Sequence, residues 1–419
     1  MGTVPAVSRW PAWAETAIWW SVYPLGACGA PIRDADTPGP HHRLSRLENW
    51  LDYLLELGCN GLQLGPIWAS TTHGYDVEDH EAIDRRLGDE ADFEALAAAC
   101  RRRGIRLLLD GVFNHVSTNH PRVLAARAEG LDSPAGRLFR RDPARPDGLA
   151  RFEGHDGLVE LDHATPEALD YVVATMEYWL ARGADGWRLD AAYRVPPAFW
   201  TEAIAQVKRR FPEMLTVAEV LHGDYGALAE QAGFDSVTQY ELWKAIWSSL
   251  TDLNPHELAW TLTRHQATHG HELAWTFISN HDVSRIASQL DPGAARVAAG
   301  LMLTLPGMPA VYYGDEQGWT GDKQERLGGD DAIRPELPDR PAALADEPAE
   351  WYQTYQRLIG LRRTHPWLAT ASVEVVHQTQ RSLRYHTWSN QGDWLDGTVS
   401  VGQDGPRLVL SDRTGQLTW

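Results

Sequence analysis

Short apolar runs alternate with amphipathic segments along most of the chain, and this alternation limits the fold more than any other feature of the sequence. The run at 61–64, for example, follows a segment at 44–57 whose leucines recur every three or four residues, as on one face of a helix. Strands that alternate with helices are typical of βα units on a parallel sheet. The sequence therefore predicts an α/β protein with a (β/α)8 barrel, the TIM-barrel architecture. The predicted strands are residues 17–23, 61–64, 106–110, 186–190, 215–219, 234–238, 275–280 and 310–313.

Two stretches interrupt this alternation. Residues 116–160 are rich in Arg, Pro, Gly and Asp and are too long for an ordinary loop, so we expect a small inserted subdomain after the third strand. After the predicted last helix at 351–364, short alternating runs with Gly-rich turns indicate a short C-terminal β domain. The predicted division is a catalytic barrel in two parts, 1–115 and 161–365, with an inserted subdomain B at 116–160 and the C-terminal β domain at 366–419.

The chain carries 38 Lys and Arg residues against 57 Asp and Glu residues, which gives a formal net charge of -19. This charge repels phosphate backbones and anionic lipid headgroups, so we expect neither nucleic acid nor a membrane surface as a partner. Three scattered cysteines without metal-ligand spacing are typical of a reducing compartment. The N-terminal stretch lacks the pattern of a signal peptide, and no apolar stretch is long enough to span a membrane. The expected location is therefore cytoplasmic.

Several apolar runs end in acidic residues, which are candidate catalytic groups. Asp110, Asp190, Glu219 and Asp282 each close a run or follow it within a few residues. Polar residues at the carboxyl ends of parallel barrel strands meet at one mouth, where burial and mutual repulsion raise the pKa of at least one carboxyl. Glycoside hydrolysis needs one carboxylate to attack the anomeric carbon and one protonated carboxyl for the leaving oxygen. Each acid taken alone has a simpler explanation, as a cap of the helix that follows.

The residues around these acids read Asp110-Gly111-Val112-Phe113-Asn114-His115, Gly186-Trp187-Arg188-Leu189-Asp190, Glu219, and Asn280-His281-Asp282. In this order they resemble the four signature regions of the α-amylase superfamily, glycoside hydrolase family 13. Residues 61–68 and 307–316 are similar to the family's motifs at the second and eighth strands. The similarity spans residues 17–320. It implies a (β/α)8 barrel and a retaining mechanism with a covalent glycosyl-enzyme.

The resemblance also implies individual catalytic roles. Asp190 matches the nucleophile, Glu219 the acid that later acts as base, and Asp282 the carboxylate that stabilises the distorted, oxocarbenium-like sugar ring. Arg188 matches the residue that holds the nucleophile ionised and oriented, because a nearby guanidinium favours the charged carboxylate. The alternative for Arg188 is a plain surface ion pair.

Four further residues match ligands of the sugar in the subsite before the cleaved bond. His115 and His281 are implied to bind its hydroxyls, since a neutral imidazole both donates and accepts hydrogen bonds. Tyr75 resembles the family's stacking platform for that sugar, and Asp110 resembles its supporting carboxylate. The alternatives are structural histidines and, for Tyr75, packing at the rim of the barrel.

No cofactor is required by this chemistry, and calcium is left open at Asn114. This residue matches a position that often binds structural calcium in family amylases, but its partners are not recognisable in this chain. Many amylases have Lys-His shortly after the nucleophile, where this chain has Ala191-Ala192-Tyr193-Arg194. The sequence therefore predicts no metal ligands.

Residues 220–224, which follow Glu219, resemble those of neopullulanase-type intracellular enzymes. The resemblance favours a hydrolase of short α-glucans or α-glucosides, with malto-oligosaccharides first and a small carbohydrate as the expected partner. The alternative is a transglycosylase or sugar isomerase, such as a glucanotransferase or a trehalose-synthase-like enzyme, which differs in how its cleft excludes water.

Two other classes of protein are disfavoured. A non-catalytic carbohydrate-binding relative has no need of all three acids. A metal-dependent barrel hydrolase typically has a His-x-His pair on its first strand, which residues 19–23 lack. The sequence leaves the exact linkage, attack at the chain end or within it, and the oligomeric state open.

Overall fold

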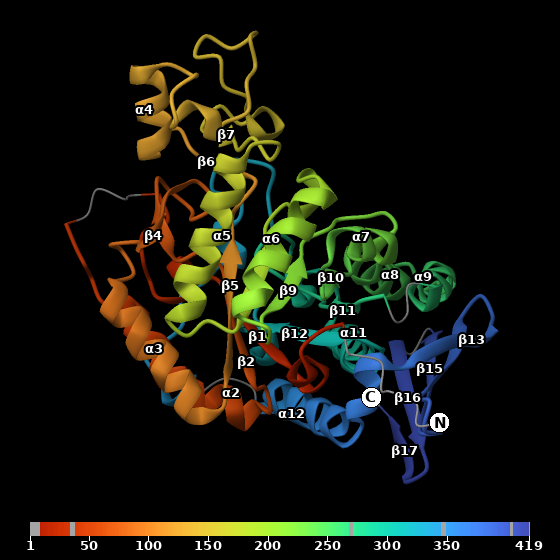
Figure 1. Ribbon diagram of the computed structural model, residues 1–419. Coiled ribbons are helices and arrows are strands. Elements are labelled where there is room, and N and C mark those ends of the chain that lie inside the picture. The colour runs from red at the N-terminus through yellow and green to blue at the C-terminus, as the bar shows by residue number, and fades with distance from the viewer. Residues whose placement is uncertain (1–8, 34–37, 268–270, 345–348, 403–404, 419) are drawn as a thin grey trace, which may run out of the picture.

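The structure is a computed structural model that describes residues 9–33, 38–267, 271–344, 349–402 and 405–418. A closed barrel of parallel strands forms its centre (Figure 1). Its strands are β1 (Trp19–Val22), β2 (Gly61–Leu64), β5 (Arg106–Gly111), β8 (Gly186–Leu189), β9 (Leu215–Ala218), β10 (Ser236–Thr238), β11 (Leu273–Thr276) and β12 (Met308–Tyr312). They follow one another around the barrel in chain order, and β12 closes it by pairing with β1. The predicted fold class is confirmed.

Helices surround the barrel, and several of them begin and end at the expected signals. Asp89 and Asp92 form a capping box at the start of α3, and Gly104 ends that helix in the left-handed conformation. Thr165 caps α5, whose first residue is a proline. Within the described ranges, no helix is both long and apolar enough to cross a lipid bilayer. The helices are α1 (Pro24–Ala27), α2 (Leu51–Leu57), α3 (Glu90–Arg103), α4 (Pro121–Glu129), α5 (Pro166–Ala181), α6 (Pro197–Arg210), α7 (Tyr225–Ala232), α8 (Tyr240–Thr251), α9 (His256–Ala267), α10 (Ile286–Gln289), α11 (Pro292–Thr304) and α12 (Ala349–Thr364).

Two predicted elements differ from the structure. The strand predicted at 275–280 is wrong in its bounds, because β11 ends at Thr276 and the chain leaves the sheet there. The apolar run continues beyond the strand because Phe277 packs edge-on against Tyr240, with their ring centroids 4.9 Å apart. The helix predicted at 44–57 begins as a 3-10 helix (Arg43–Trp50) and becomes α-helical at α2. Its buried leucines have a spacing of three or four residues, which both helix types place on one face.

Two short antiparallel strand pairs stand at the ends of neighbouring barrel strands. The first, β3 (Trp68–Ser70) with β4 (Val77–Ile83), follows β2 and is absent from the sequence prediction. The second, β6 (His115–Ser117) with β7 (Leu158–Glu160), encloses α4 within the stretch predicted as an inserted subdomain. Figure 1 shows β6, β7 and α4 together beyond one end of the barrel.

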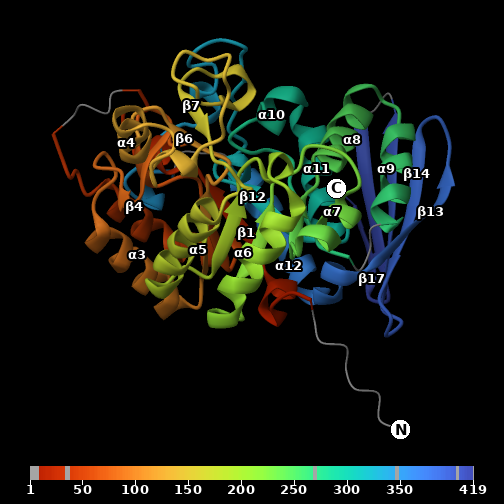
Figure 2. The same ribbon diagram turned by 45° about the horizontal axis from the view of Figure 1, so that its top comes forward.

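The C-terminal part of the chain forms a five-stranded antiparallel sheet beside the barrel (Figures 1 and 2). Burial alternates along β15, as expected for a sheet with one face on a core and one face in solvent. The sheet contacts α9 and α11 of the barrel layer. Its strands are β13 (Ser372–Gln378), β14 (Ser382–Trp388), β15 (Trp394–Gly402), β16 (Gly405–Asp412) and β17 (Gly415–Thr418). The residue boundaries between the four predicted segments of the chain stay a prediction.

Candidate active site

The ends of three neighbouring strands bring predicted residues to one mouth of the barrel. Asp110 lies near the end of β5, Asp190 directly follows β8, and Glu219 directly follows β9. In the barrel β8 lies between β5 and β9, and Asp110 is in register with Arg188. Arg188 and Asp190 are two residues apart, a spacing that places side chains on the same face of an extended chain.

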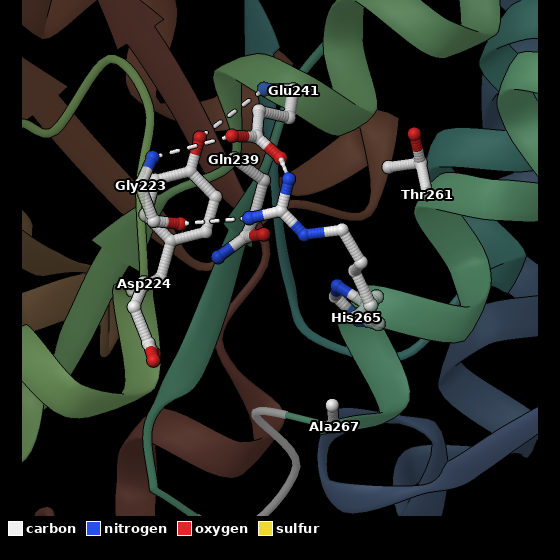
Figure 3. A pocket seen from close by; sticks show the side chains of 9 residues that line it. Gly223, Asp224, Gln239, Glu241, Thr261, His265 and Ala267 are labelled. Atoms are coloured by element: carbon white, nitrogen blue, oxygen red, sulfur yellow. Dashed lines mark hydrogen bonds and ion pairs between the residues drawn. The ribbon is translucent and has the colours of Figure 1, made fainter.

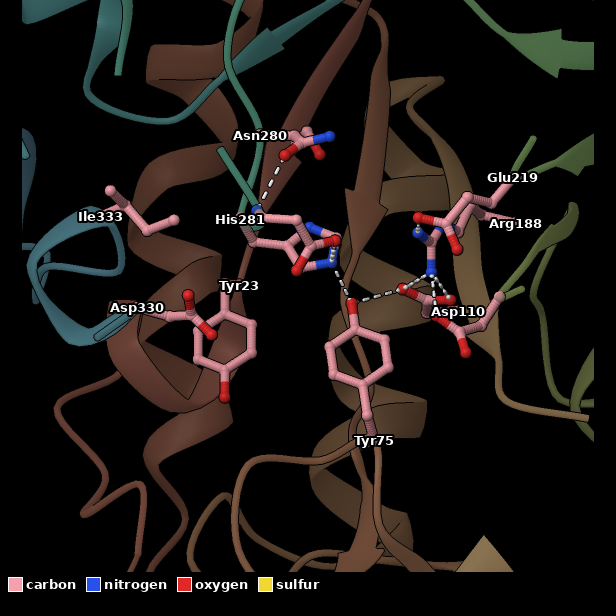
Figure 4. A network of polar contacts seen from close by, with 12 residues as sticks. Tyr23, Tyr75, Asp110, Arg188, Glu219, Asn280, His281, Asp330 and Ile333 are labelled. Atoms are coloured by element: carbon pink, nitrogen blue, oxygen red, sulfur yellow. Dashed lines mark hydrogen bonds and ion pairs between the residues drawn. The ribbon is translucent and has the colours of Figure 1, made fainter. Parts of the chain in front are cut away.

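The guanidinium of Arg188 contacts three carboxylates at once (Figure 4). Its Nη1 lies 2.8 Å from Oδ1 of Asp110 and 2.9 Å from Oδ1 of Asp190. Its Nη2 lies 2.6 Å from Oε1 of Glu219. All four residues are buried, so their charges interact with little screening by water. Arg188 is therefore not a surface ion pair, and it fixes the three acids relative to one another.

Tyr75 links these acids to the loop after β11. Its hydroxyl donates to Oδ2 of Asp110 at 3.0 Å and also hydrogen-bonds Nε2 of His281. The rings of Tyr75 and His281 are stacked with centroids 5.3 Å apart, and Tyr23 stacks on His281 at 6.3 Å (Figure 4). His281 in turn pairs with Asp282, with 2.9 Å between Nε2 and Oδ2. The predicted residues from β5, β8, β9 and the two loops thus form one connected network.

His115 lies at the start of β6 and joins the inserted stretch to the site. Its Nε2 hydrogen-bonds the carbonyl oxygen of Tyr75 at 3.0 Å, and its Nδ1 lies 3.2 Å from the amide nitrogen of Asn114. The ring stacks on Phe152, with centroids 4.5 Å apart. Burial lowers the pKa of His115 to about 4, so the imidazole is neutral at pH 7. Both ring nitrogens have protein partners, so the role of His115 in sugar binding stays a prediction.

Burial raises the pKa of each carboxyl around Arg188. The pKa of Asp190 is raised to about 6 because burial disfavours the charged form, while Arg188 acts in the opposite direction. Burial likewise raises the pKa of Glu219 against the effect of Arg188, and Asp190 adds repulsion. Burial raises the pKa of Asp110 to about 7. The pKa of each of the three acids is therefore higher than that of an exposed carboxyl.

Asp282 has the opposite electrostatic character. Burial alone raises its pKa, but His281 and Arg334 outweigh this effect and hold the pKa well below its usual range. Nη2 of Arg334 lies 3.4 Å from Oδ1 of Asp282, and its Nε donates to the carbonyl oxygen of His281 at 3.0 Å. Asp282 is therefore ionised at neutral pH, beside acids whose pKa values are raised.

Two residues at this mouth are absent from the sequence prediction. One is Arg334, which lies in a long loop after β12 that has no recognisable pattern. The other is Tyr240, whose hydroxyl donates to Oε1 of Glu219 at 3.3 Å. Tyr240 follows β10 by two residues, so the rule that strand ends converge at one mouth points to it as well. A tyrosine at this position does not by itself indicate a catalytic or binding role, so the sequence alone did not single it out.

The surroundings of Asn114 do not fit a calcium ion. The side-chain amide of Asn114 hydrogen-bonds the ring of His115, and the acid opposite His115 in the β6–β7 pair is Glu160. Glu160 pairs with Arg140 at 2.9 Å and lies 3.8 Å from Arg194, so positive charge already lies beside its carboxylate. Among the described residues, side chains that suit a metal gather in a group of three at the start of α3 instead, namely His42, Asp89 and Asp92. No step of the chemistry below involves a metal.

A separate pocket of about 180 Å³ lies behind the loop that follows Glu219 (Figure 3). Between its walls, Arg264 pairs with Glu241 at 2.7 Å. Glu241 accepts from the backbone N–H of Gly223 at 3.2 Å, and Arg264 donates to the carbonyl oxygen of Gly223 at 3.1 Å. This ion pair therefore holds the two peptide groups on either side of the Gly223 Cα atom. None of the predicted site residues lines the pocket.

Comparison with known proteins gives consistent relatives. Neopullulanase 2 of Thermoactinomyces vulgaris is 28% identical over 442 residues, covering 98% of this chain and 73% of that protein. A cyclomaltodextrinase of Bacillus sp is 28% identical over 418 residues, covering 90% of this chain and 71% of that protein. The structure of cyclic α-maltosyl-(1→6)-maltose hydrolase from Arthrobacter globiformis, in complex with cyclic α-maltosyl-(1→6)-maltose, aligns with a TM-score of 0.82 at 25% identity, covering 98% of this chain and 99% of that chain.

The family model described as "Alpha amylase, catalytic domain" matches residues 43–145 and 151–372, which is most of the chain. The matched residues include every barrel strand except β1, the acids at the barrel mouth and most of the inserted stretch between β6 and β7. The resemblance to the α-amylase superfamily is thereby confirmed, and so is the neopullulanase-like character of the relatives. The chain belongs to the α-amylase family of glycoside hydrolases, glycoside hydrolase family 13.

Proposed function

We propose that this glycoside hydrolase acts on short α-glucans by a retaining mechanism, with Asp190 as nucleophile and Glu219 as acid and base. The observation that carries this proposal is the contact of one buried guanidinium, that of Arg188, with both of these carboxylates. A double displacement needs two carboxyl groups with different protonation states beside one bond. Burial and the sharing of a single cation favour such a difference.

In the first step, an oxygen of Asp190 attacks the anomeric carbon. The glycosidic C–O bond breaks, and Glu219 gives its proton to the leaving oxygen. The product of this step is a β-linked glycosyl-enzyme, and Glu219 is left ionised. In the second step, Glu219 removes a proton from water as the water oxygen attacks the same carbon and Asp190 leaves. Two inversions give a sugar with the original α configuration.

The other residues of the site position the sugar and stabilise charge. Ionised Asp282 stabilises the positive charge that develops on the ring in the transition state. Tyr75 offers an aromatic face for the ring and is held in place by its hydrogen bonds to Asp110 and His281. The ring of His281 pairs directly with the carboxylate of Asp282, so a sugar hydroxyl bound by His281 is coupled to that carboxylate.

We infer that the substrates are malto-oligosaccharides, linear or cyclic. The names of the relatives support this: a neopullulanase, a cyclomaltodextrinase and a hydrolase of a cyclic maltosyl-maltose. Transglycosylation and isomerisation use the same acids and are outcomes that the product analysis below distinguishes. We also propose that the protein acts in the cytoplasm. Three cysteines, Cys28, Cys59 and Cys100, are buried as free thiols, which is typical of proteins in a reducing compartment.

The test compares wild-type protein with the variants Asp190→Asn and Asp185→Asn. Products from maltose, maltotriose, isomaltose, trehalose, sucrose and a cyclic dextrin are followed by NMR, which resolves the anomeric form. We expect wild-type protein to release α-configured products and Asp190→Asn to lose about a thousandfold or more in kcat/KM, because the nucleophile is removed.

Asp185→Asn is the matched control. Asp185 lies just before β8, at the opposite end of the strand from Asp190, and pairs with Arg106 at 2.7 Å. It is expected to keep nearly full activity. New linkages with little free glucose would make transglycosylation the function. Products of β configuration would overturn the retaining mechanism, and an active Asp190→Asn protein would overturn Asp190 as its nucleophile.

A further inference from the structure

Tyr240 touches the carboxyl group that the proposed mechanism uses as acid and base. Its hydroxyl lies 3.3 Å from Oε1 of Glu219. The residue begins α8 and is 9% exposed, and its ring packs edge-on against Phe277 at 4.9 Å and Trp243 at 6.0 Å. The ring is therefore held from two sides, and the hydroxyl has a fixed place beside Glu219.

Asn280 determines the direction in which the Tyr240 hydroxyl donates. The side-chain oxygen of Asn280 accepts from the backbone N–H of Asp282 at 2.8 Å, which fixes the orientation of the amide. Its nitrogen then donates to the Tyr240 oxygen at 2.9 Å. A hydroxyl has one proton to donate, so an oxygen that already accepts from Asn280 has its proton available for Glu219. Burial raises the pKa of Tyr240 well above its usual value, so this proton is present at any working pH.

The positive charge and the hydroxyl beside Glu219 both lie at one of its two oxygens. Oε1 lies 2.6 Å from Nη2 of Arg188, which is an ion-pair contact, and accepts a hydrogen bond from the hydroxyl of Tyr240 at 3.3 Å. Oε2 accepts a hydrogen bond from the backbone N–H of Ala191 at 2.8 Å. An oxygen that faces both a cation and a hydroxyl donor is the poorer site for a proton. This difference favours Oε2 as the protonated oxygen.

We propose that Tyr240 is a positioning residue for Glu219, which holds Oε1 as an acceptor so that Oε2 presents the proton to the leaving oxygen. Through Asn280, the same chain of hydrogen bonds joins the acid to the backbone of Asp282. Tyr240 acts through Glu219 and needs no contact with the sugar. This inference rests on the proposed role of Glu219, and its test separates the two.

The test uses two substrates that differ in their need for an acid. Maltotriose has a poor leaving group that must be protonated, whereas α-maltosyl fluoride releases fluoride without protonation. We measure kcat/KM, which covers the steps up to the glycosyl-enzyme, for wild-type protein and Tyr240→Phe. We expect kcat/KM of Tyr240→Phe to fall about tenfold for maltotriose and to stay within about twofold for the fluoride. The alkaline limb of its pH profile is expected to lie at higher pH, because Glu219 loses a donor that favours its ionised form.

Glu219→Gln and Tyr385→Phe are the reference variants. Glu219→Gln is expected to show the same preference for the fluoride in an extreme form, and if it does not, the proposed role of Glu219 itself is wrong. Tyr385→Phe removes a buried hydroxyl in the C-terminal sheet, which lies 3.4 Å from the hydroxyl of Thr304, and should change neither rate. If Glu219→Gln behaves as expected but Tyr240→Phe loses both activities equally, or neither, Tyr240 does not position the acid.

Discussion

Arg188 contributes more to the site than the neutralisation of one charge. A single guanidinium faces the carboxyls of Asp110, Asp190 and Glu219, so the cluster has more acids than cations. Buried carboxylates in excess of their counter-ions retain a proton, because neutralisation costs less than an unpaired buried charge. The planar fork of arginine, unlike the single ammonium of lysine, reaches several oxygens in fixed directions. The excess of buried acids over cations thus explains how one acid of the cluster stays protonated, as the proposed mechanism requires.

The pH dependence of activity follows from these residues. In the proposed mechanism Asp190 acts in its ionised form, and its pKa is raised to about 6, so kcat/KM is expected to fall as the pH drops through about 6. Glu219 acts there in its protonated form, and burial raises its pKa, so activity is expected to fall again on the alkaline side. A plot of kcat/KM for maltotriose against pH is expected to be bell-shaped. A profile that stays flat from about pH 7 to 5 would contradict the burial of the nucleophile.

At the scale of elements, the inserted stretch after β5 forms part of the site. The β6–β7 pair begins at His115, and the 3-10 turn at Phe152–Gly154 returns toward it. Phe152 stacks on the His115 ring, and His115 in turn bonds the backbone of Tyr75. Glu153 within this turn has φ 46°, a conformation that non-glycine residues adopt at a cost. The turn therefore supports His115 and Tyr75, which form the wall of the proposed sugar subsite, from outside the barrel.

Removal of the Phe152 ring tests this support. We expect Phe152→Ala to raise KM for maltotriose about two- to tenfold, because the stacking energy that holds His115 is lost, with a smaller effect on kcat. Leu124→Ala is the control, since Leu124 lies on α4 of the same stretch and is 50% exposed. An unchanged KM in Phe152→Ala would show that the turn does not support the subsite.

At the scale of the whole molecule, the C-terminal sheet is joined to the barrel through close packing. Strand β16 contacts α11, where Gly300 is buried within the helix. A Cβ atom at Gly300 would lie 2.6 Å from Cδ2 of Leu408, which is too close for an ordinary contact. The absence of a side chain at Gly300 lets the sheet approach the helix, and the joint is separate from the barrel mouth.

A side chain at this joint should lower stability without affecting the chemistry. We expect Gly300→Val to reduce the free energy of unfolding by about 1–3 kcal/mol, as measured by urea unfolding, with kcat/KM unchanged in the folded protein. Gly360→Val in α12 is the matched control, because a Cβ there meets no atom within 4 Å. Its free energy of unfolding should change by less than about 0.5 kcal/mol. Equal effects of the two substitutions would mean that the joint is not closely packed.

Local patterns were sufficient to predict the barrel strands and the acids at their ends. Each buried strand is a short apolar run, and each acid closes such a run or follows it within a few residues, so both features can be recognised from a few consecutive residues. The bounds of β11 could not be predicted, since Phe277 is buried by ring packing after the strand has ended. The β3–β4 hairpin, which carries Tyr75 in its turn, lacks a strong alternation and is also missing from the prediction. Such features depend on partners elsewhere in the chain.

The sequence by itself determined the α/β class, the barrel, the family and the acids that the barrel brings to one mouth. Only the tertiary structure decided that Arg188 contacts three of these acids, that Arg334 holds Asp282, and that Tyr240 contacts Glu219. Arg334 and Asp282 are 52 residues apart in the sequence. Periodicity reports the environment of a residue within its own element, whereas a hydrogen bond between elements depends on how those elements pack. The candidate acids could therefore be predicted from the sequence, whereas the residues that contact them could be identified only from the fold.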